Sequence, residues 1–300
     1  MNLILNIKAK ILLKEEVVPN IFLIKLLAPL IAQEAIPGQF MHIKCSQDYY
    51  PLLRRPISIH RIDKEKGEIF ILFQVVGEGT KLLSQKAIGD ELDILGPLGN
   101  GFNIYPQSQK IMIVGGGIGV ASLLALAEES IRQGKEVRVL IGALKRELVL
   151  GEESFRSLGA KVDIVTDDGS YKHKGLITNL LEEDIQEGWL PDQIFTCGPK
   201  PMLRKIAEIA SKVNIDGQVS LEEHMGCGIG ACLGCVCKIK TNLSACLPER
   251  GPVCRADTGR RSQSGNAQAE EKNNSKEEYD YKRVCVDGPV FKASEVIWDD

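Results

Sequence analysis

The stretch Cys227-Gly-Ile-Gly-Ala-Cys232-Leu-Gly-Cys235 places three cysteines at C-x4-C-x2-C spacing among glycines. This is the plant-type [2Fe–2S] ligand spacing, which takes a fourth cysteine from farther along the chain. The thiolates must surround two irons from several sides, and the glycines let the backbone turn tightly beneath the sulfurs. Structural zinc usually uses paired CxxC knuckles, and disulfide frameworks belong mainly to small secreted domains. The stretch therefore predicts an iron–sulfur cluster, with a zinc-bound structural module as the alternative.

Length and composition are those of a multidomain globular protein. The 300 residues are enough for about two domains or three small ones, and 44% of them are hydrophobic. The net charge of −3 gives no sign of nucleic-acid binding. Residues 3–8 alternate apolar and polar side chains, which predicts a strand and not a signal peptide, and no stretch approaches the roughly 18 apolar residues of a membrane span. Nine cysteines without an export signal indicate a reducing compartment, so we expect a cytoplasmic protein with no nucleic-acid or membrane partner.

The chain divides into three parts by its pattern of strands and helices. Residues 1–105 hold short strand-like segments separated by turns and predict a β-barrel. Residues 106–216 alternate strands with helices and predict a parallel α/β sheet. Residues 217–300 hold the cysteines, and a polar, mixed-charge segment near 243–281 predicts a disordered insertion. The expected strands are 21–27, 40–44, 57–60, 69–76, 111–114, 137–141, 162–165 and 193–196, and the expected helices are 120–132 and 201–213.

A glycine-rich turn is the main sequence evidence for nucleotide binding. Strand 111–114 runs into Gly115-Gly-Gly-Ile-Gly119 and then into a helix, an order that points backbone N–H groups at a phosphate. The match to the dinucleotide-binding glycine pattern is loose, because Val120 occupies the third position, and such turns also occur in sheets that bind nothing. Thr196-Cys-Gly-Pro199 ends a later strand, at the sheet edge where ligands bind. For Cys197 itself, a buried small hydrophobe is the alternative interpretation.

The barrel segment carries two candidate anion-binding stretches, Arg54-Arg-Pro-Ile-Ser58 and Gly77-Glu-Gly-Thr80. Each taken alone is also compatible with a solvated charge or a simple turn. A nicotinamide cofactor exchanges two electrons as a hydride, whereas an iron–sulfur cluster exchanges one, and flavin does both kinds of chemistry. A chain with a nucleotide-binding sheet and an iron–sulfur loop therefore predicts a flavin site, and the barrel is the part left to supply it.

These motifs together resemble the ferredoxin reductase family. They are Arg54-Arg-Pro-Ile-Ser-Ile59, Gly96-Pro-Leu-Gly-Asn-Gly-Phe102, Val114-Gly-Gly-Gly-Ile-Gly119, Thr196-Cys-Gly-Pro199 and the stretch 222–235. Within that family the chain is similar to the electron-transfer subunits of NAD-linked (class 1B) dihydroorotate dehydrogenases, and Arg283-Val-Cys-Val-Asp-Gly-Pro-Val-Phe291 fits the same subunits. The resemblance covers nearly the whole chain except about residues 241–282.

The resemblance implies three cofactors and a partner. FAD would be bound on the barrel by Arg55, Pro56, Ile57, Ser58, Leu72, Phe73, Gln74, Gly79 and Thr80. NAD(H) would be bound on the α/β sheet, its phosphates near Gly115, Gly116, Gly117 and Gly119 and its nicotinamide near Cys197, Gly198 and Pro199. A [2Fe–2S] cluster would be held by Cys227, Cys232, Cys235 and Cys285.

The implied partner is an FMN-containing dihydroorotate dehydrogenase catalytic subunit, in a heterotetramer of two copies of each. Electrons would pass from its FMN through the cluster and FAD to NAD+, in pyrimidine (UMP) biosynthesis. The alternative is a related subunit of an NADH-dependent ferredoxin:NADP oxidoreductase or a sulfide dehydrogenase. NAD and NADP stay open, because Lys145 and Arg146 follow a strand where they could meet a 2′-phosphate.

The fourth cluster ligand departs from the family pattern. Cys285 has the matching local context but lies far from Cys235, whereas Cys246 offers a shorter gap inside the predicted insertion. Each doubling of loop length costs only about 0.6 kcal/mol, so the longer closure adds roughly 1 kcal/mol. We therefore expect Cys285 as the ligand, with Cys246 as the alternative, and expect Cys237 to be a strand residue beside the site.

Overall fold

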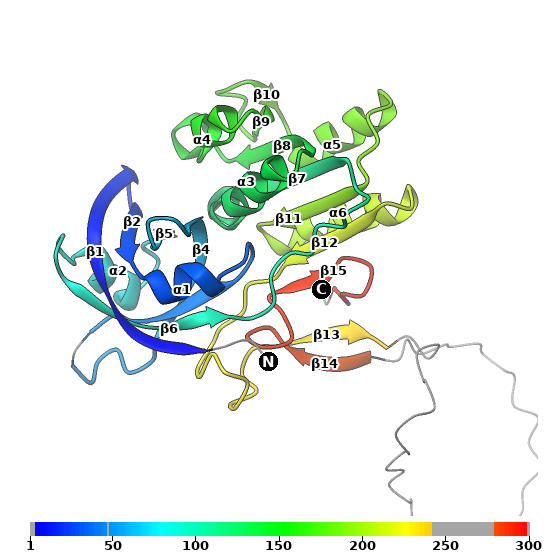
Figure 1. Cartoon of the computed structure of the whole chain (residues 1–300). Helices are drawn as coiled ribbons and strands as arrows, with labels where there is room; N and C mark the ends of the chain where they lie inside the picture. Colours follow the sequence, from blue (N-terminus) through cyan, green and yellow to red (C-terminus); the bar gives the residue numbers. More distant parts are fainter. Residues whose placement is uncertain (1–3, 47, 242–278, 299–300) are drawn as a thin grey trace, which may run out of the picture.

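The computed structural model describes residues 4–46, 48–241 and 279–298, which form a barrel, a large sheet and a two-stranded sheet (Figure 1). The expected fold class, a barrel followed by a parallel α/β sheet and a cysteine-bearing subdomain, is confirmed. In this described part, no helix has both the length and the apolar character that a membrane crossing requires.

The barrel closes in the order β1-β2-β5-β4-β3-β6, and its neighbouring strands are antiparallel. Its strands are β1 (Leu5–Val18), β2 (Ile21–Leu27), β3 (Phe40–Lys44), β4 (Arg55–Asp63), β5 (Glu68–Gln74) and β6 (Glu91–Leu98), with helices α1 (Pro29–Glu34) and α2 (Glu78–Ser84). The period-two alternation of strands sends Met41 and Ile43 into the barrel core. It leaves Phe40 and His42, also buried, on the outer face, which another part of the chain must therefore cover.

The large sheet has the order β10-β9-β8-β7-β11-β12-β15. Its strands are β7 (Lys110–Gly116), β8 (Glu136–Ala143), β9 (Lys161–Thr166), β10 (His173–Lys174), β11 (Gln193–Cys197), β12 (Asp216–Ser220) and β15 (Val290–Lys292). All pair in parallel except β15, which runs antiparallel to β12. Helices α3 (Leu124–Arg132) and α4 (Glu152–Ser157) cover one face, and α5 (Ile177–Gln186) and α6 (Lys200–Lys212) cover the other.

Two features of this sheet differ from the sequence-based expectation. The helix expected to begin at residue 120 is preceded by a 3-10 turn, η1 (Gly117–Leu123), and the α-helix proper starts at Leu124. A second short 3-10 turn, η2 (Arg146–Leu148), follows β8. The sheet also extends past the predicted boundary at residue 216, because β12 runs to Ser220 and β15 comes from the C-terminal segment.

The C-terminal subdomain contains the hairpin-like pair β13 (Val236–Lys240) and β14 (Tyr279–Arg283), in which Lys238 lies opposite Tyr281. The insertion was predicted near residues 243–281, and its last three residues, 279–281, pair with β13. The remainder of that predicted segment, with Cys246, lies outside the described residues.

One hydrophobic core joins all three parts. Phe40 and Leu98 of the barrel, Val219 of the large sheet, and Cys235 and Cys285 of the subdomain pack in the same cluster of buried side chains. The cysteine-bearing segment is thus fixed against both of the other parts at once.

Candidate functional site

The four cysteines predicted as ligands form two contacting pairs, and the Cys227 thiol is close enough to Cys285 to raise its pKa. Cys235 and Cys285 are 2% and 1% exposed, and the amide N–H of Cys285 donates to the Cys235 sulfur at 3.4 Å. The Cys227 sulfur accepts from the amides of Ala231 and Cys232, at 3.2 and 3.4 Å. Burial opposes ionisation of Cys227, but amide donors including these two bring its pKa down to about 7. This favours the thiolate, which is the form that binds a metal.

The thiols pair as Cys227 with Cys232 and Cys235 with Cys285. Throughout the part of the chain that the structure describes, no three His, Cys, Asp or Glu side chains are grouped so that they could hold one metal ion. Two pairs of thiolates suit the predicted group with two irons, each bound by one pair.

The loop that carries Cys285 is fixed by the barrel. The Asn100 side chain, in the Gly-Pro-Leu-Gly-Asn-Gly-Phe motif, donates to the carbonyls of Val286 and Asp287 at 3.1 and 3.0 Å. The Val284 amide donates to the Cys235 carbonyl at 2.8 Å. Two motifs far apart in sequence therefore hold the second thiol pair in place.

The predicted flavin residues lie on neighbouring strands β4 and β5 and on α2. Arg55 and Gly79 are in contact, because a Cβ added at Gly79 would lie 2.6 Å from Arg55 Nε. The Thr80 hydroxyl accepts from the amides of Val76 and Gly77, at 3.0 and 3.2 Å, and donates to the Gly77 carbonyl. Thr80 thus shapes the turn that presents Gly79, and its predicted contact with a phosphate stays a prediction.

The strand alternation separates these residues by face. Ile57 and Phe73 belong to the barrel core, so only their backbone is left for a bound group. Leu72 points outward and packs on Ala121 and Leu150 of the α/β part. Pro56 and Ser58 are partly exposed, and Gln74 is exposed. The sequence motif marks both faces of the strand, but the side chains available to a ligand come from the outer face.

The two predicted nicotinamide-cofactor motifs are in direct contact. Cys197 lies opposite Gly115 in the β11–β7 register. A Cβ on Gly119 would lie 2.6 Å from the Cys197 carbonyl carbon and oxygen, and one on Gly116 would lie 3.0 Å from Pro199. Gly117 has φ +54° and open space around it, while Gly198 has φ +154° and faces the Gly116 backbone. Only glycines allow these two loops to approach so closely.

Cys197 is fully enclosed. Burial, with the nearby Glu222 charge, raises the pKa of Cys197 to about 12, although Ser122 and Ser220 interact with its thiol. Sequence reasoning did not single out these two serines. Ser220 ends β12 just before the cysteine-bearing stretch. Its position at the carboxyl end of a strand, where ligands bind, could have identified it from the sequence.

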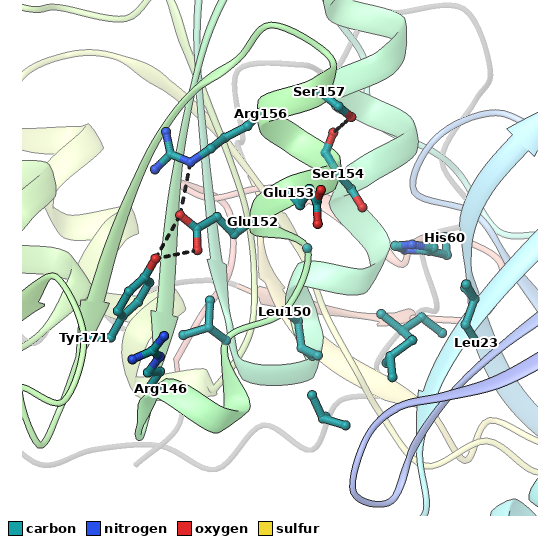
Figure 2. Close-up of a pocket in the computed structure, with 15 residues that line it drawn as sticks. Leu23, His60, Arg146, Leu150, Glu152, Glu153, Ser154, Arg156, Ser157 and Tyr171 are labelled. Atoms are coloured by element: carbon teal, nitrogen blue, oxygen red, sulfur yellow. Dashed lines mark hydrogen bonds and ion pairs between the residues drawn. The ribbon is translucent and has the colours of Figure 1, made fainter.

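A cavity of about 870 Å³ opens between the barrel and the large sheet (Figure 2). Leu23 and His60 line it from the barrel, and Arg146, Glu152 and Tyr171 line it from the sheet side. Tyr171 and Arg156 both donate to the Glu152 carboxylate, at 3.2 and 3.1 Å, and the Arg146 guanidinium lies 5.1 Å from the Tyr171 ring centre. Residues 146 and 171 follow the carboxyl ends of β8 and β9, where open α/β sheets bind ligands. Lys145 is instead 3.9 Å from Glu147 and does not line the cavity.

The chain combines a closed antiparallel barrel, a parallel α/β sheet and a cysteine-bearing loop. This combination is that of the ferredoxin-reductase class of electron-transfer proteins. A solved structure of an NADH-dependent reduced ferredoxin–NADP oxidoreductase is similar over 97% of this chain and 90% of its own, with a TM-score of 0.75 and 25% identity. The ferredoxin reductase of carbazole 1,9a-dioxygenase, at 21% identity, shares the fold with a TM-score of 0.62 over 71% of this chain and 67% of its own.

The sequence relatives are more specific. The iron–sulfur cluster binding domain of dihydroorotate dehydrogenase B matches residues 222–258 and 270–297. The dihydroorotate dehydrogenase B (NAD(+)) electron transfer subunit of Desulforamulus reducens is 37% identical over 97% of this chain and 98% of its own. That of Caldanaerobacter subterraneus is 43% identical over 87% of each. The chain belongs to this family of electron transfer subunits, which confirms the resemblance and supports [2Fe–2S], FAD and NAD(H) as its cofactors.

Proposed function

We propose that this chain relays electrons from the FMN-containing catalytic subunit of a dihydroorotate dehydrogenase to NAD+, in pyrimidine (UMP) biosynthesis. The observation that carries the proposal is that the barrel contacts both the cysteine segment and the large sheet. The outer face of β3 packs on the buried cysteine segment, while β4 and β5 meet η1 of the nucleotide-binding sheet. A flavin bound on the barrel would therefore lie near the cysteines on one side and near the sheet on the other.

Each cofactor has a proposed set of residues. Cys227, Cys232, Cys235 and Cys285 would hold the cluster, and the contact between Cys285 and Cys235 favours Cys285 over Cys246. The flavin set on β4, β5 and α2 would hold FAD, and the two contacting loops of the sheet would hold NAD(H). When bound, the cluster carries single electrons and the flavin exchanges both single electrons and a hydride. The chain's own residues would orient these groups and exclude water.

The overall reaction balances without a further reactant. Dihydroorotate loses two electrons and two protons on the partner subunit, and NAD+ gains two electrons and one proton on this chain. One proton is released to water. The fully buried Cys197, with its pKa of about 12, stays a neutral thiol and adds no charge beside the nicotinamide.

Two apolar side chains of the cysteine loop are exposed at the surface, which supports a partner docking there. Leu233 is 63% exposed and Ile229 is 48% exposed, and both belong to the loop itself. Exposed apolar patches of this kind mark interaction sites. We propose the catalytic subunit as that partner, in a heterotetramer of two copies of each. The described cysteines are free thiols, in accord with the proposed cytoplasmic location.

The similarity to the ferredoxin–NADP oxidoreductase structure favours a second candidate, a related subunit that serves that enzyme. The decisive experiment is NAD+-dependent oxidation of dihydroorotate by the FMN-containing subunit, with and without this chain. Activity that depends on this chain is expected, and a Cys235→Ser chain serves as the control that breaks the relay. A chain that reduces artificial acceptors with NADH but never supports dihydroorotate oxidation would refute the partner and leave the cofactor chemistry standing.

A further inference from the structure

His42 lies at the contact between the barrel and the cysteine loop. It is on β3, opposite Pro56 of β4 and Leu95 of β6, and only 1% of its surface is exposed. Its neighbours Met41 and Ile43 fill the barrel core, so the imidazole stands on the outer face. This face is the one that the cysteine segment covers, as Phe40 on the same face shows.

The ring touches the loop directly beside the first cysteine. A Cβ added at Gly228 would lie 2.5 Å from His42 Nδ1 and 3.1 Å from both Cγ and Cε1, so its three nearest atoms all belong to this ring. Gly228 also has φ +72°, which disfavours any other residue. The backbone next to Cys227 is therefore shaped around the imidazole.

The backbones of Cys227 and Arg54 lie near the His42 ring, but neither ring nitrogen makes a hydrogen bond of good geometry among the described residues. A buried polar group without a partner costs about 1–3 kcal/mol, and such groups in folded proteins are nearly always satisfied. A neutral imidazole carries one N–H donor. The group expected in contact with this loop is the [2Fe–2S] cluster, whose sulfurs are acceptors.

We propose that His42 donates its ring N–H to the sulfurs at the Cys227 end of the cluster and thereby raises the reduction potential of the cluster. Hydrogen bonds to the sulfurs are among the factors that set the potential of such clusters, and a donor stabilises the more negative, reduced form. His42 is thus a positioning and tuning residue between the barrel and the cluster. The inference rests on the proposed function only in that Cys227 is a cluster ligand.

The test is an EPR-monitored redox titration of the full chain with its cofactors. His42→Phe keeps a ring without a donor, and His42→Gln is the matched control that keeps an N–H. The bond is stronger to the more negative, reduced cluster, and we expect this difference to be about a tenfold change in the ratio of reduced to oxidised cluster when the bond is lost. For one electron this is a shift of about 59 mV, to a more negative potential. We expect the shift in His42→Phe and a near-normal potential in His42→Gln, and equal potentials in His42→Phe and the unmodified chain would overturn the inference.

A second measurement needs no substitution at His42. The chain is labelled with 15N-histidine in a His224→Gln background, because His224 is close to Cys227 in sequence and its label would otherwise confuse the result. Pulsed EPR of the reduced cluster is expected to detect coupling to a histidine nitrogen. A cluster signal without that coupling overturns the inference alone. The absence of any reduced-cluster signal would overturn the cluster assignment, and this inference with it.

Discussion

His60 on β4 and Ala121 in η1 are joined by a hydrogen bond of 2.6 Å from the imidazole Nδ1 to the main-chain carbonyl. Because a carbonyl only accepts, Nδ1 carries the proton. The bond links the barrel to the nucleotide-binding sheet at the edge of the cavity that His60 lines. Burial lowers the pKa of His60, and the bond to Ala121 offsets this only in part.

This lowered pKa predicts a pH-dependent stability. The unfolded chain protonates His60 near its ordinary pKa of 6.5, whereas the folded chain resists protonation. Stability contributed by neutral His60 is therefore fully present above pH 6.5 and is lost as the pH falls below it. We expect thermal unfolding of His60→Gln to change less between about pH 7.5 and 5.5 than that of the unmodified chain. Equal slopes for the two proteins would contradict the assignment.

Sequence pattern predicted elements better than contacts between them. The limits of β2 and β3 agree with the expected strands, because each is a short apolar run bounded by turns. The antiparallel addition of β15 to β12 was not predicted, since it depends on how the subdomain folds back on the sheet. The contact of His42 with Gly228 could likewise not be predicted from the sequence, because no local pattern relates residues so far apart in the chain.

The fourth ligand can be tested by paired substitutions. Cys285→Ser removes a thiol that lies beside Cys235 in the shared core, and we expect it to abolish stable cluster incorporation. Cys246→Ser is the matched control and should leave the cluster intact. Iron content and visible absorbance of the purified proteins measure the outcome. The reverse result, with loss only in Cys246→Ser, would transfer the ligand role to Cys246.

Gly119→Ala tests the contact between the two loops of the sheet. The new methyl group would lie 2.6 Å from the Cys197 backbone, so the loops must separate. Overpacking of this kind costs about 1–3 kcal/mol, and we expect a lower melting temperature together with weaker NADH binding. Unchanged NADH affinity in a folded Gly119→Ala protein would refute the role of this loop contact.

Arg146→Ala tests whether the cavity at the ends of β8 and β9 takes the nicotinamide cofactor. The guanidinium lies against the Tyr171 ring within the cavity, and we expect its loss to remove about 1 kcal/mol of cofactor binding. The KM for NADH in an artificial-acceptor assay should then rise about fivefold with little change in kcat, because Arg146 follows β8, two strands along from β11, which ends at Cys197. Arg132→Ala is the control, since that arginine is 73% exposed and pairs with Glu129 outside this cavity. An unchanged KM for NADH would exclude the cavity as a binding site, and a selective loss of NADPH use would instead assign Arg146 to a 2′-phosphate.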